Sequence, residues 1–316
     1  MTTFTLAHLS DLHLSAPALT GKVLRSPKRM LAYLSWRTRK RGRHDLDILA
    51  AAAADVRALD PDAIVITGDL THLGLPSEFD QVREWLPSLG PSERVRLVPG
   101  NHDRTASEAD GATLERWRAW VAPEQDASAS IVFPTVRIAG GVALVGLSSA
   151  RPSSPLLAVG SLGQEQIHRL DAILDDMSRS QCFRVVFLHH PPGSDVVGWR
   201  KRLTDADALQ AVLERRGAEM ILHGHAHRPT WDSMDLQDRT IPVVGASSVS
   251  EVRHGGAAYH TYGITPAEHG YEIVAEVRTW RPEARRFESE PRGRFLISDD
   301  QPSVFPGPVG TKRWNH

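Results

Sequence analysis

Polar side chains that are able to bind metal ions follow five apolar runs of the sequence. Asp11 and His13 come after Phe4–Leu9, and Asp69 comes after Ala63–Thr67. Asn101, His102 and Asp103 follow the run Val95–Val98, His189 follows Val185–Leu188, and His225 and His227 follow Met220–Leu222. Carboxylates, amide oxygens and imidazoles are ligands that suit Mn²⁺, Fe²⁺/Fe³⁺ or Zn²⁺, and no thiolate is among them. The residue types therefore indicate a site for first-row metal ions.

The elements that must position these residues are short strands. The runs are about five residues long and rich in Val, Ile and Leu, as expected of strands covered on both faces, and Val142–Leu147 and Pro242–Val244 belong to the same set. Helical patterns alternate with them at Asp45–Leu59, Ser77–Leu86 (with Ser77 as its N-cap), Ala112–Val121, Gln164–Met177 and Asp205–Arg215. This alternation predicts an α/β layered fold.

The strand ends explain how residues far apart in the sequence come together. In open α/β sheets, ligand sites form outside the carboxyl ends of the strands. Asp11 and His13 are two residues apart, as are His225 and His227. In an extended chain this spacing turns both side chains of a pair to one side. We therefore expect one cluster of Asp, Asn and His side chains.

The composition is that of an ordinary globular domain. Hydrophobic residues make up 41% of the 316 residues and charged residues 24%. The net charge of −1 gives no overall electrostatic attraction that would indicate binding to nucleic acid or to a membrane. Cys182 is the single cysteine, which excludes an intramolecular disulfide. No signal-peptide pattern and no transmembrane run of about 18 apolar residues is present, so we expect a cytoplasmic protein.

The ordered motifs resemble those of the calcineurin-like metallophosphoesterases. D-x-H, G-D, G-N-H-D, a later H and G-H-x-H occur in that order from Asp11 to His227. The resemblance implies a four-layer α/β/β/α sandwich, with two mixed sheets flanked by helices, over residues 1–290. Residues 291–316 are rich in Pro and Gly and are expected to form an extended C-terminal tail.

The resemblance also implies a role for each motif residue. Two divalent or trivalent ions (Mn²⁺, Fe²⁺/Fe³⁺ or Zn²⁺) would share Asp69 as a bridge. One ion would be held by Asp11, His13 and His227, and the other by Asn101, His189 and His225. His102 would be the catalytic histidine near the leaving group, and Asp103 would orient it through a hydrogen bond. A hydroxide activated by the ions would attack phosphorus in line with the departing oxygen.

A basic segment at about residues 20–44 separates the first two motifs and predicts a helical insertion after the first strand. From Leu14 to His44 the chain has no acidic residue and nine Lys or Arg residues: Lys22, Arg25, Lys28, Arg29, Arg37, Arg39, Lys40, Arg41 and Arg43. Three interpretations stay open. Residues 22–44 form a solvated cap, a platform for an anionic substrate or a lipid headgroup at a membrane surface, or, less favoured, a nucleic-acid contact.

The most favoured function is hydrolysis of a phosphodiester, either a cyclic nucleotide or another small diester. The stretch F-L-H-H-P-P at residues 187–192 looks most like the bacterial class III cyclic-nucleotide phosphodiesterases. One alternative is a pyrophosphatase acting on a lipid-linked nucleotide diphosphate such as UDP-2,3-diacylglucosamine, although those enzymes usually carry Arg where His102 stands. A catalytically silent scaffold is disfavoured because every ligand position is filled. A homodimer and, if residues 22–44 bind lipid, a peripheral position at the inner membrane face remain open.

Overall fold

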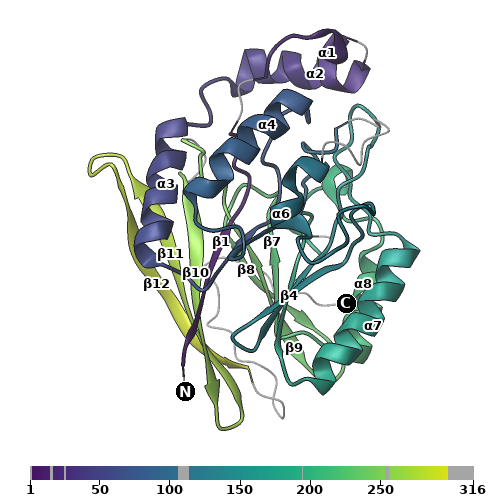
Figure 1. Ribbon diagram of the computed structural model, residues 1–316, viewed down its shortest axis with the longest axis vertical. Helices are drawn as coiled ribbons and strands as arrows, with labels where there is room; N and C mark the ends of the chain where they lie inside the picture. The colour runs from purple at the N-terminus through teal and green to yellow at the C-terminus, as the bar shows by residue number, and fades with distance from the viewer. Residues whose placement is uncertain are drawn as a thin grey trace.

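Two six-stranded mixed sheets form the centre of the computed structural model (Figure 1). The structure describes residues 2–14, 17–24, 26–105, 114–193, 195–252 and 256–297, and at Lys22, Arg39 and Lys40 it describes the backbone alone. The first sheet has the order β12-β11-β10-β1-β2-β3 and the second β4-β5-β6-β7-β9-β8. The first is built from β1 (Phe4–Leu9), β2 (Ala63–Ile66), β3 (Val95–Leu97), β10 (Ala258–Ala267), β11 (Gly270–Arg281) and β12 (Arg286–Ile297). The second is built from β4 (Thr135–Ala139), β5 (Val142–Gly146), β6 (Phe183–Phe187), β7 (Met220–His223), β8 (Thr230–Asp235) and β9 (Thr240–Gly245).

Helices cover the outer face of each sheet and complete four layers. The first sheet packs against α3 (Leu46–Leu59), α4 (Pro76–Trp85) and α6 (Arg118–Val121), and the second against α7 (Gln164–Arg179) and α8 (Ala206–Arg216) (Figure 1). A third apolar cluster, which includes Leu6, Val65 and Phe187, fills the space between the sheets. The expected α/β/β/α sandwich is confirmed. In the described part of the chain, no helix is both long enough and apolar enough to cross a bilayer.

The parallel strands in the middle of each sheet match the apolar runs. All residues of β2, β5, β6 and β7 are buried, as expected where helices or a second sheet cover both faces. Among the described residues, short 3₁₀ turns are formed by η2 (Leu86–Ser88), η3 (Glu115–Trp117) and η4 (Trp199–Lys201). The expected helix at Ala112–Val121 is described from Leu114 onward as η3 followed by α6, and residues 112–113 lie outside the described residues.

Two expectations about element boundaries were wrong. α4 has Leu75 as its N-cap residue and Pro76 in its first turn, so Ser77 lies inside the helix. The side chain of Glu78 accepts a hydrogen bond of 2.9 Å from the Leu75 backbone N–H, which caps this end instead. The tail expected from Pro291 does not begin there, because β12 continues to Ile297 and pairs with β11. Residues 298–316 lie outside the described residues.

The expected basic helical insertion is observed at one end of the molecule (Figure 1). It consists of α1 (Gly21–Leu24), α2 (Pro27–Ser35) and the π-helical turn η1 (Trp36–Lys40). Arg29 is buried, and its guanidinium donates to the carbonyl oxygens of Leu73 and Gly74 at 3.1 and 2.9 Å. One of the nine cations therefore fixes the insertion to the loop that follows β2. Arg25 lies outside the described residues.

Candidate dinuclear metal centre

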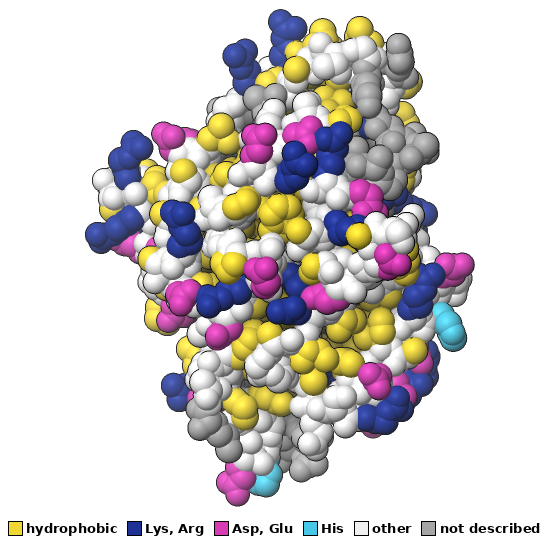
Figure 2. All heavy atoms as spheres, in the orientation of Figure 1, with side chains coloured by type: hydrophobic (Ala, Val, Ile, Leu, Met, Phe, Trp, Pro, Cys, Tyr) yellow, Lys and Arg dark blue, Asp and Glu magenta, His cyan; other side chains and the backbone are white. Residues whose placement is uncertain are grey.

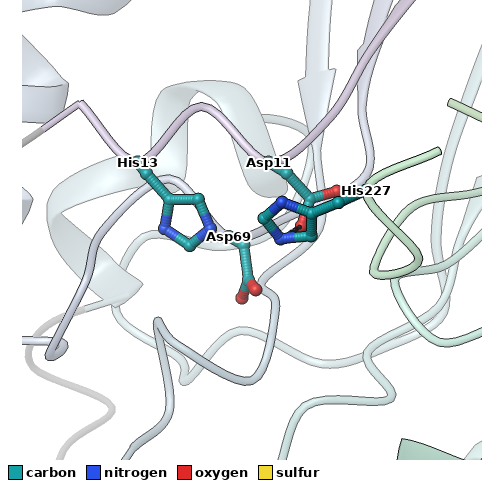
Figure 3. Close-up of side chains that lie close together, drawn as sticks. All are labelled: Asp11, His13, Asp69 and His227. Carbon is teal, nitrogen blue, oxygen red and sulfur yellow. Dashed lines mark ion pairs between the residues drawn. The ribbon is translucent and has the colours of Figure 1, made fainter. Parts of the chain in front are cut away.

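The metal-binding residues expected from the sequence lie in two groups that share one member. Asp11, His13, Asp69 and His227 place one ligand atom each within 4.8 Å of the others, and Asp69, His189 and His225 do the same. Figure 3 shows the first group converging from three separate segments of the chain. Asp69 belongs to both groups, so its carboxylate occupies the position of a bridge.

Asn101 joins the second group. Its Oδ1 lies 3.1 Å from Nε2 of His189, and the same nitrogen lies 3.1 Å from Nδ1 of His225 and 3.4 Å from Oδ2 of Asp69. All four side chains are buried. The structure thus brings together all seven residues that the motifs nominate as ligands.

The loops that carry these residues are not extended, contrary to the spacing argument. Five of the candidate ligand residues have left-handed backbone conformations: Asp11 (φ 51°), His13 (φ 45°), Asp69 (φ 54°), His225 (φ 69°) and His227 (φ 53°). Such conformations are uncommon for non-glycine residues and gather where a functional arrangement requires them. The side chains of each pair converge because the backbone turns sharply after the strand.

Hydrogen bonds fix the orientation of three imidazoles. Nδ1 of His13 donates to the carbonyl oxygen of Thr71 at 3.0 Å, and Nδ1 of His189 donates to that of Thr67 at 2.7 Å. Nδ1 of His227 lies 2.9 Å from a carboxylate oxygen of Glu251. Because an oxygen acceptor at Nδ1 keeps a proton there, Nε2 is the atom of each ring through which a metal ion would be bound.

The donor set fits a pair of first-row metal ions. Among the described atoms, Oδ1 of Asp11 and Nε2 of His225 are buried and make no hydrogen bond. Oδ1 of Asp11 lies 3.2 Å from Nε2 of His227, another candidate ligand atom. Buried polar atoms without hydrogen-bond partners are rare, and a bound cation would satisfy Nε2 of His225.

Two motif glycines allow the loops to approach this closely. A Cβ atom on Gly100 would lie 2.2 Å from Oδ1 of Asp69, and one on Gly224 would lie 1.9 Å from Oγ of Ser10. Both distances are far shorter than a van der Waals contact. The glycines of G-N-H-D and G-H-x-H are therefore required by the packing around Asp69 and Asp11.

The family model for calcineurin-like phosphoesterases matches residues 4–229. The chain belongs to this family. A probable cyclic nucleotide phosphodiesterase of Synechococcus sp. (strain WH7803) is 28% identical to this phosphoesterase over 222 residues, which are 66% of this chain and 76% of that protein. The cAMP/cGMP dual specificity phosphodiesterase of Mycobacterium tuberculosis is 27% identical over 177 residues, or 54% of this chain and half (50%) of that protein.

Solved structures agree on the fold. A dimetal phosphatase from Danio rerio superposes with a TM-score of 0.62 at 17% identity, covering 93% of this chain and 100% of that one. The phosphoesterase therefore has the family's fold together with a candidate His/Asp dimetal site.

The surroundings of His102 differ from the expected arrangement. Nδ1 of His102 donates to the carbonyl oxygen of His72 at 2.6 Å, and its backbone N–H donates to Oδ1 of Asp69 at 2.7 Å. The carboxylate of Asp103 instead accepts from the backbone N–H groups of Thr71 (2.9 Å) and Gly100 (2.8 Å). Asp103 thus joins two site loops, and burial together with nearby Asp69 raises its pKa to about 7. The expectation that Asp103 orients His102 was wrong.

Sequence reasoning missed the loop after β9. Glu251 accepts from Nδ1 of His227 and also pairs with Arg43 of the basic segment. In the same loop, Oγ of Ser248 donates to the backbone carbonyl of Asp11 at 2.6 Å, and Oγ of Ser250 donates to that of Leu12 at 2.7 Å. The sequence predicts a strand at Pro242–Val244, and the polar stretch that follows this run is the signal that indicates the loop.

Replacing Glu251 with Gln should weaken metal binding without unfolding the protein. The amide no longer supplies negative charge to the Nδ1–H of His227, so the ring becomes a poorer ligand. We expect a loss of roughly 10–100-fold in affinity for one of two Mn²⁺ ions, measured by calorimetric titration. Arg43→Gln, which leaves the Glu251–His227 contact in place, is the matched control. Equal affinities for wild type and Glu251→Gln would contradict this role.

The carboxylates of the site favour the protonated form of two imidazoles. Burial lowers the pKa of His189, but Asp69 and then Asp11 outweigh it and raise the value to about 9. Burial likewise opposes the charge on His227, and Asp11 and Glu251 raise its pKa to about 9. By contrast, burial and neighbouring imidazoles hold the pKa values of His13 and His225 well below the usual range. Below pH 9 the site therefore carries protons that a metal ion must displace.

Metal binding should release about two protons near pH 7, one each from His189 and His227. The apparent affinity of each ion then falls about tenfold for each pH unit below 9, because the free protein is stabilised in its protonated form. Calorimetric Mn²⁺ titrations in Tris and in PIPES, which differ in ionisation enthalpy, measure the number released. An observed enthalpy that is the same in both buffers would show that both rings are neutral before binding.

Proposed function

We propose that this phosphoesterase hydrolyses phosphodiesters, cyclic nucleotides or other small diesters, at a dinuclear centre. The observation that supports this most strongly is the shared position of Asp69 between two buried ligand groups. A similar activity is named for the relatives from Synechococcus and M. tuberculosis. We assign Asp11, His13 and His227 to one ion, and Asn101, His189 and His225 to the other.

The bound ions would supply Lewis-acid charge and lower the pKa of water at the site. The chain's own residues then position the reaction. Asn101 and His102 line a cavity beside the two ligand groups, so a substrate's phosphorus in reach of the ions is also in reach of His102. Since Nδ1 of His102 donates to the carbonyl oxygen of His72, Nε2 is the ring atom that would hold a proton for the leaving oxygen.

Turnover of chromogenic esters tests this function. Protein loaded with Mn²⁺ should hydrolyse bis-p-nitrophenyl phosphate faster than p-nitrophenyl phosphate, and elemental analysis should find two ions per chain. Asn101→Ala should retain one ion and lose orders of magnitude in rate. Faster turnover of the monoester would refute the phosphodiesterase proposal, and undiminished activity of Asn101→Ala would refute the assignment of the second ion.

A further inference from the structure

A cavity of about 630 Å³ lies between the basic insertion and the metal centre. Asn101 and His102 form the end nearest the ligands, while α2 and η1 form one wall and residues 155–158 form the facing wall. The volume is in the range of sites that bind organic molecules. The insertion therefore contributes directly to the space in which a substrate would lie.

The walls of this cavity are apolar and only partly covered. Leu31 and Leu34 of α2 are 45% and 48% exposed, and Leu156 on the facing wall is 78% exposed. Trp36 and Leu157 extend the same surface. Exposed apolar side chains gathered around a hollow mark a binding site, because a ligand that covers them removes apolar surface from water.

The charged residues that line the cavity are all cations. Lys28, Arg200 and Lys201 contribute to it, and no Asp or Glu is among the lining residues that the structure describes. In Figure 2, basic and apolar side chains lie together at the end of the molecule formed by α1 and α2. This combination complements an anion that carries an apolar group.

Lys28 joins the two walls. Its ammonium donates to the carbonyl oxygen and hydroxyl of Ser153 at 3.0 and 2.6 Å, and to the carbonyl oxygen of Leu157 at 3.3 Å. Burial lowers its pKa, so these three contacts take the place of solvent. Lys28 thus connects α2 with residues 153–157 on the other side of the cavity.

We infer that the substrate of this phosphoesterase is a phosphoester with a long apolar substituent, which lies along Leu31 and Leu34 while the phosphate lies at the metal centre. This inference rests on the proposed function and narrows its substrate class to esters that carry such a substituent, in place of cyclic nucleotides. The basic segment acts mainly through the apolar face of α2. The cations that line the cavity attract the anionic phosphate group of the substrate.

Binding of alkyl phosphates tests the inference separately from turnover. Methyl, butyl and octyl phosphate are titrated calorimetrically into Mn²⁺-loaded protein below their micellar concentrations. Each methylene that enters the cavity should tighten Kd about three- to fourfold, so octyl phosphate should bind on the order of 100-fold more tightly than butyl phosphate. Hydrolysis of bis-p-nitrophenyl phosphate, measured in parallel, reports on the proposed function alone.

Matched variants locate the effect on α2. Leu31→Ser with Leu34→Ser should reduce the octyl-to-butyl ratio to below about tenfold, because both side chains line the cavity. Met30→Ser is the control, since Met30 is 39% exposed on the same helix and does not line the cavity. Circular dichroism verifies that each variant is folded.

Three results would overturn the inference. The first is a Kd that does not depend on chain length. The second is adenosine monophosphate binding more tightly than octyl phosphate, with an affinity that the double variant leaves unchanged. The third is sedimentation with phosphatidylglycerol vesicles that the double variant and Met30→Ser reduce equally, which would assign this surface to a membrane.

Discussion

Replacement of Asp69 by Asn is expected to remove both metal ions and nearly all activity. Asp69 is the one side chain common to both ligand groups, and it also accepts a hydrogen bond from the backbone of His102. The amide removes the negative charge between two cations, so each ion loses a ligand and gains repulsion from its neighbour. We expect kcat to fall on the order of 10⁴-fold, equivalent to about 5–6 kcal/mol of transition-state stabilisation.

Elemental analysis and turnover of bis-p-nitrophenyl phosphate measure the two losses together. Asp47→Asn provides the control, because Asp47 is an exposed carboxylate on α3 outside the site. Asn101→Ala serves as the graded comparison, with one ion expected to remain. A protein that keeps two ions and its rate after Asp69→Asn would show that this carboxylate is no bridge.

The close approach of the seven candidate ligands was predictable because it depends on chain order and strand ends. Parallel strands such as β1, β2 and β3 deliver their carboxyl ends to one edge of a sheet, so a polar residue after each apolar run is close to the others. The left-handed backbone at Asp11 and His13 could not be predicted, since no local preference of these residue types requires it. The conformation is imposed by the surrounding loops.

The hydrogen bonds of Asp103 could not be inferred from its neighbours in the sequence. A carboxylate next to His102 in sequence suggests a partner for that imidazole, but adjacent residues in a turn point in different directions. The fold places the backbone N–H groups of Leu70 and Thr71 around Asp103 and the carbonyl of His72 beside His102. Those contacts join segments about 30 residues apart, and no short motif encodes them.

Strand β12 was not predicted to extend past Pro291, because its formation also depends on contacts with a distant segment. Pro291 and Gly293 disfavour a strand in sequence, because proline has no N–H to donate and glycine adds flexibility. β12 lies at the edge of its sheet, and its register with β11 shifts between Ala275 and Glu276, opposite this part of the strand. Edge strands tolerate proline at such irregularities, so tertiary pairing overrides the local signal.

The contacts of the basic segment help to decide between the interpretations of residues 22–44. Arg29 binds two backbone carbonyls, Arg43 pairs with Glu251, and Lys28 joins the cavity walls. Arg37 and Arg41 are exposed. Three of the nine cations therefore make contacts inside the protein. Fewer positive charges remain on the surface to bind a nucleic acid or another polyanion. The interpretation as a substrate platform is retained in a modified form, with apolar residues of α2 as its main surface.

Replacement of His102 by Ala is expected to slow hydrolysis of esters with poor leaving groups while both metal ions remain bound. His102 is not a member of either ligand group, and its Nδ1 is held by the His72 carbonyl. Loss of a positioned proton donor typically costs 10²–10⁴-fold, so we expect a fall of about that size in kcat for alkyl phosphodiesters. The nitrophenolate group leaves without a proton, and its diester should lose much less.

The comparison of leaving groups separates proton donation from structural damage. A variant that merely distorted the loop at Asp69 would lose metal and would slow both kinds of ester equally. His168→Ala is the control, because His168 is exposed on α7 away from the site. Hydrolysis of ethyl p-nitrophenyl phosphate and diethyl phosphate, followed by phosphorus NMR, provides the pair. Equal losses on both substrates with two ions retained would mean that His102 stabilises the phosphoryl group and gives no proton to the leaving oxygen.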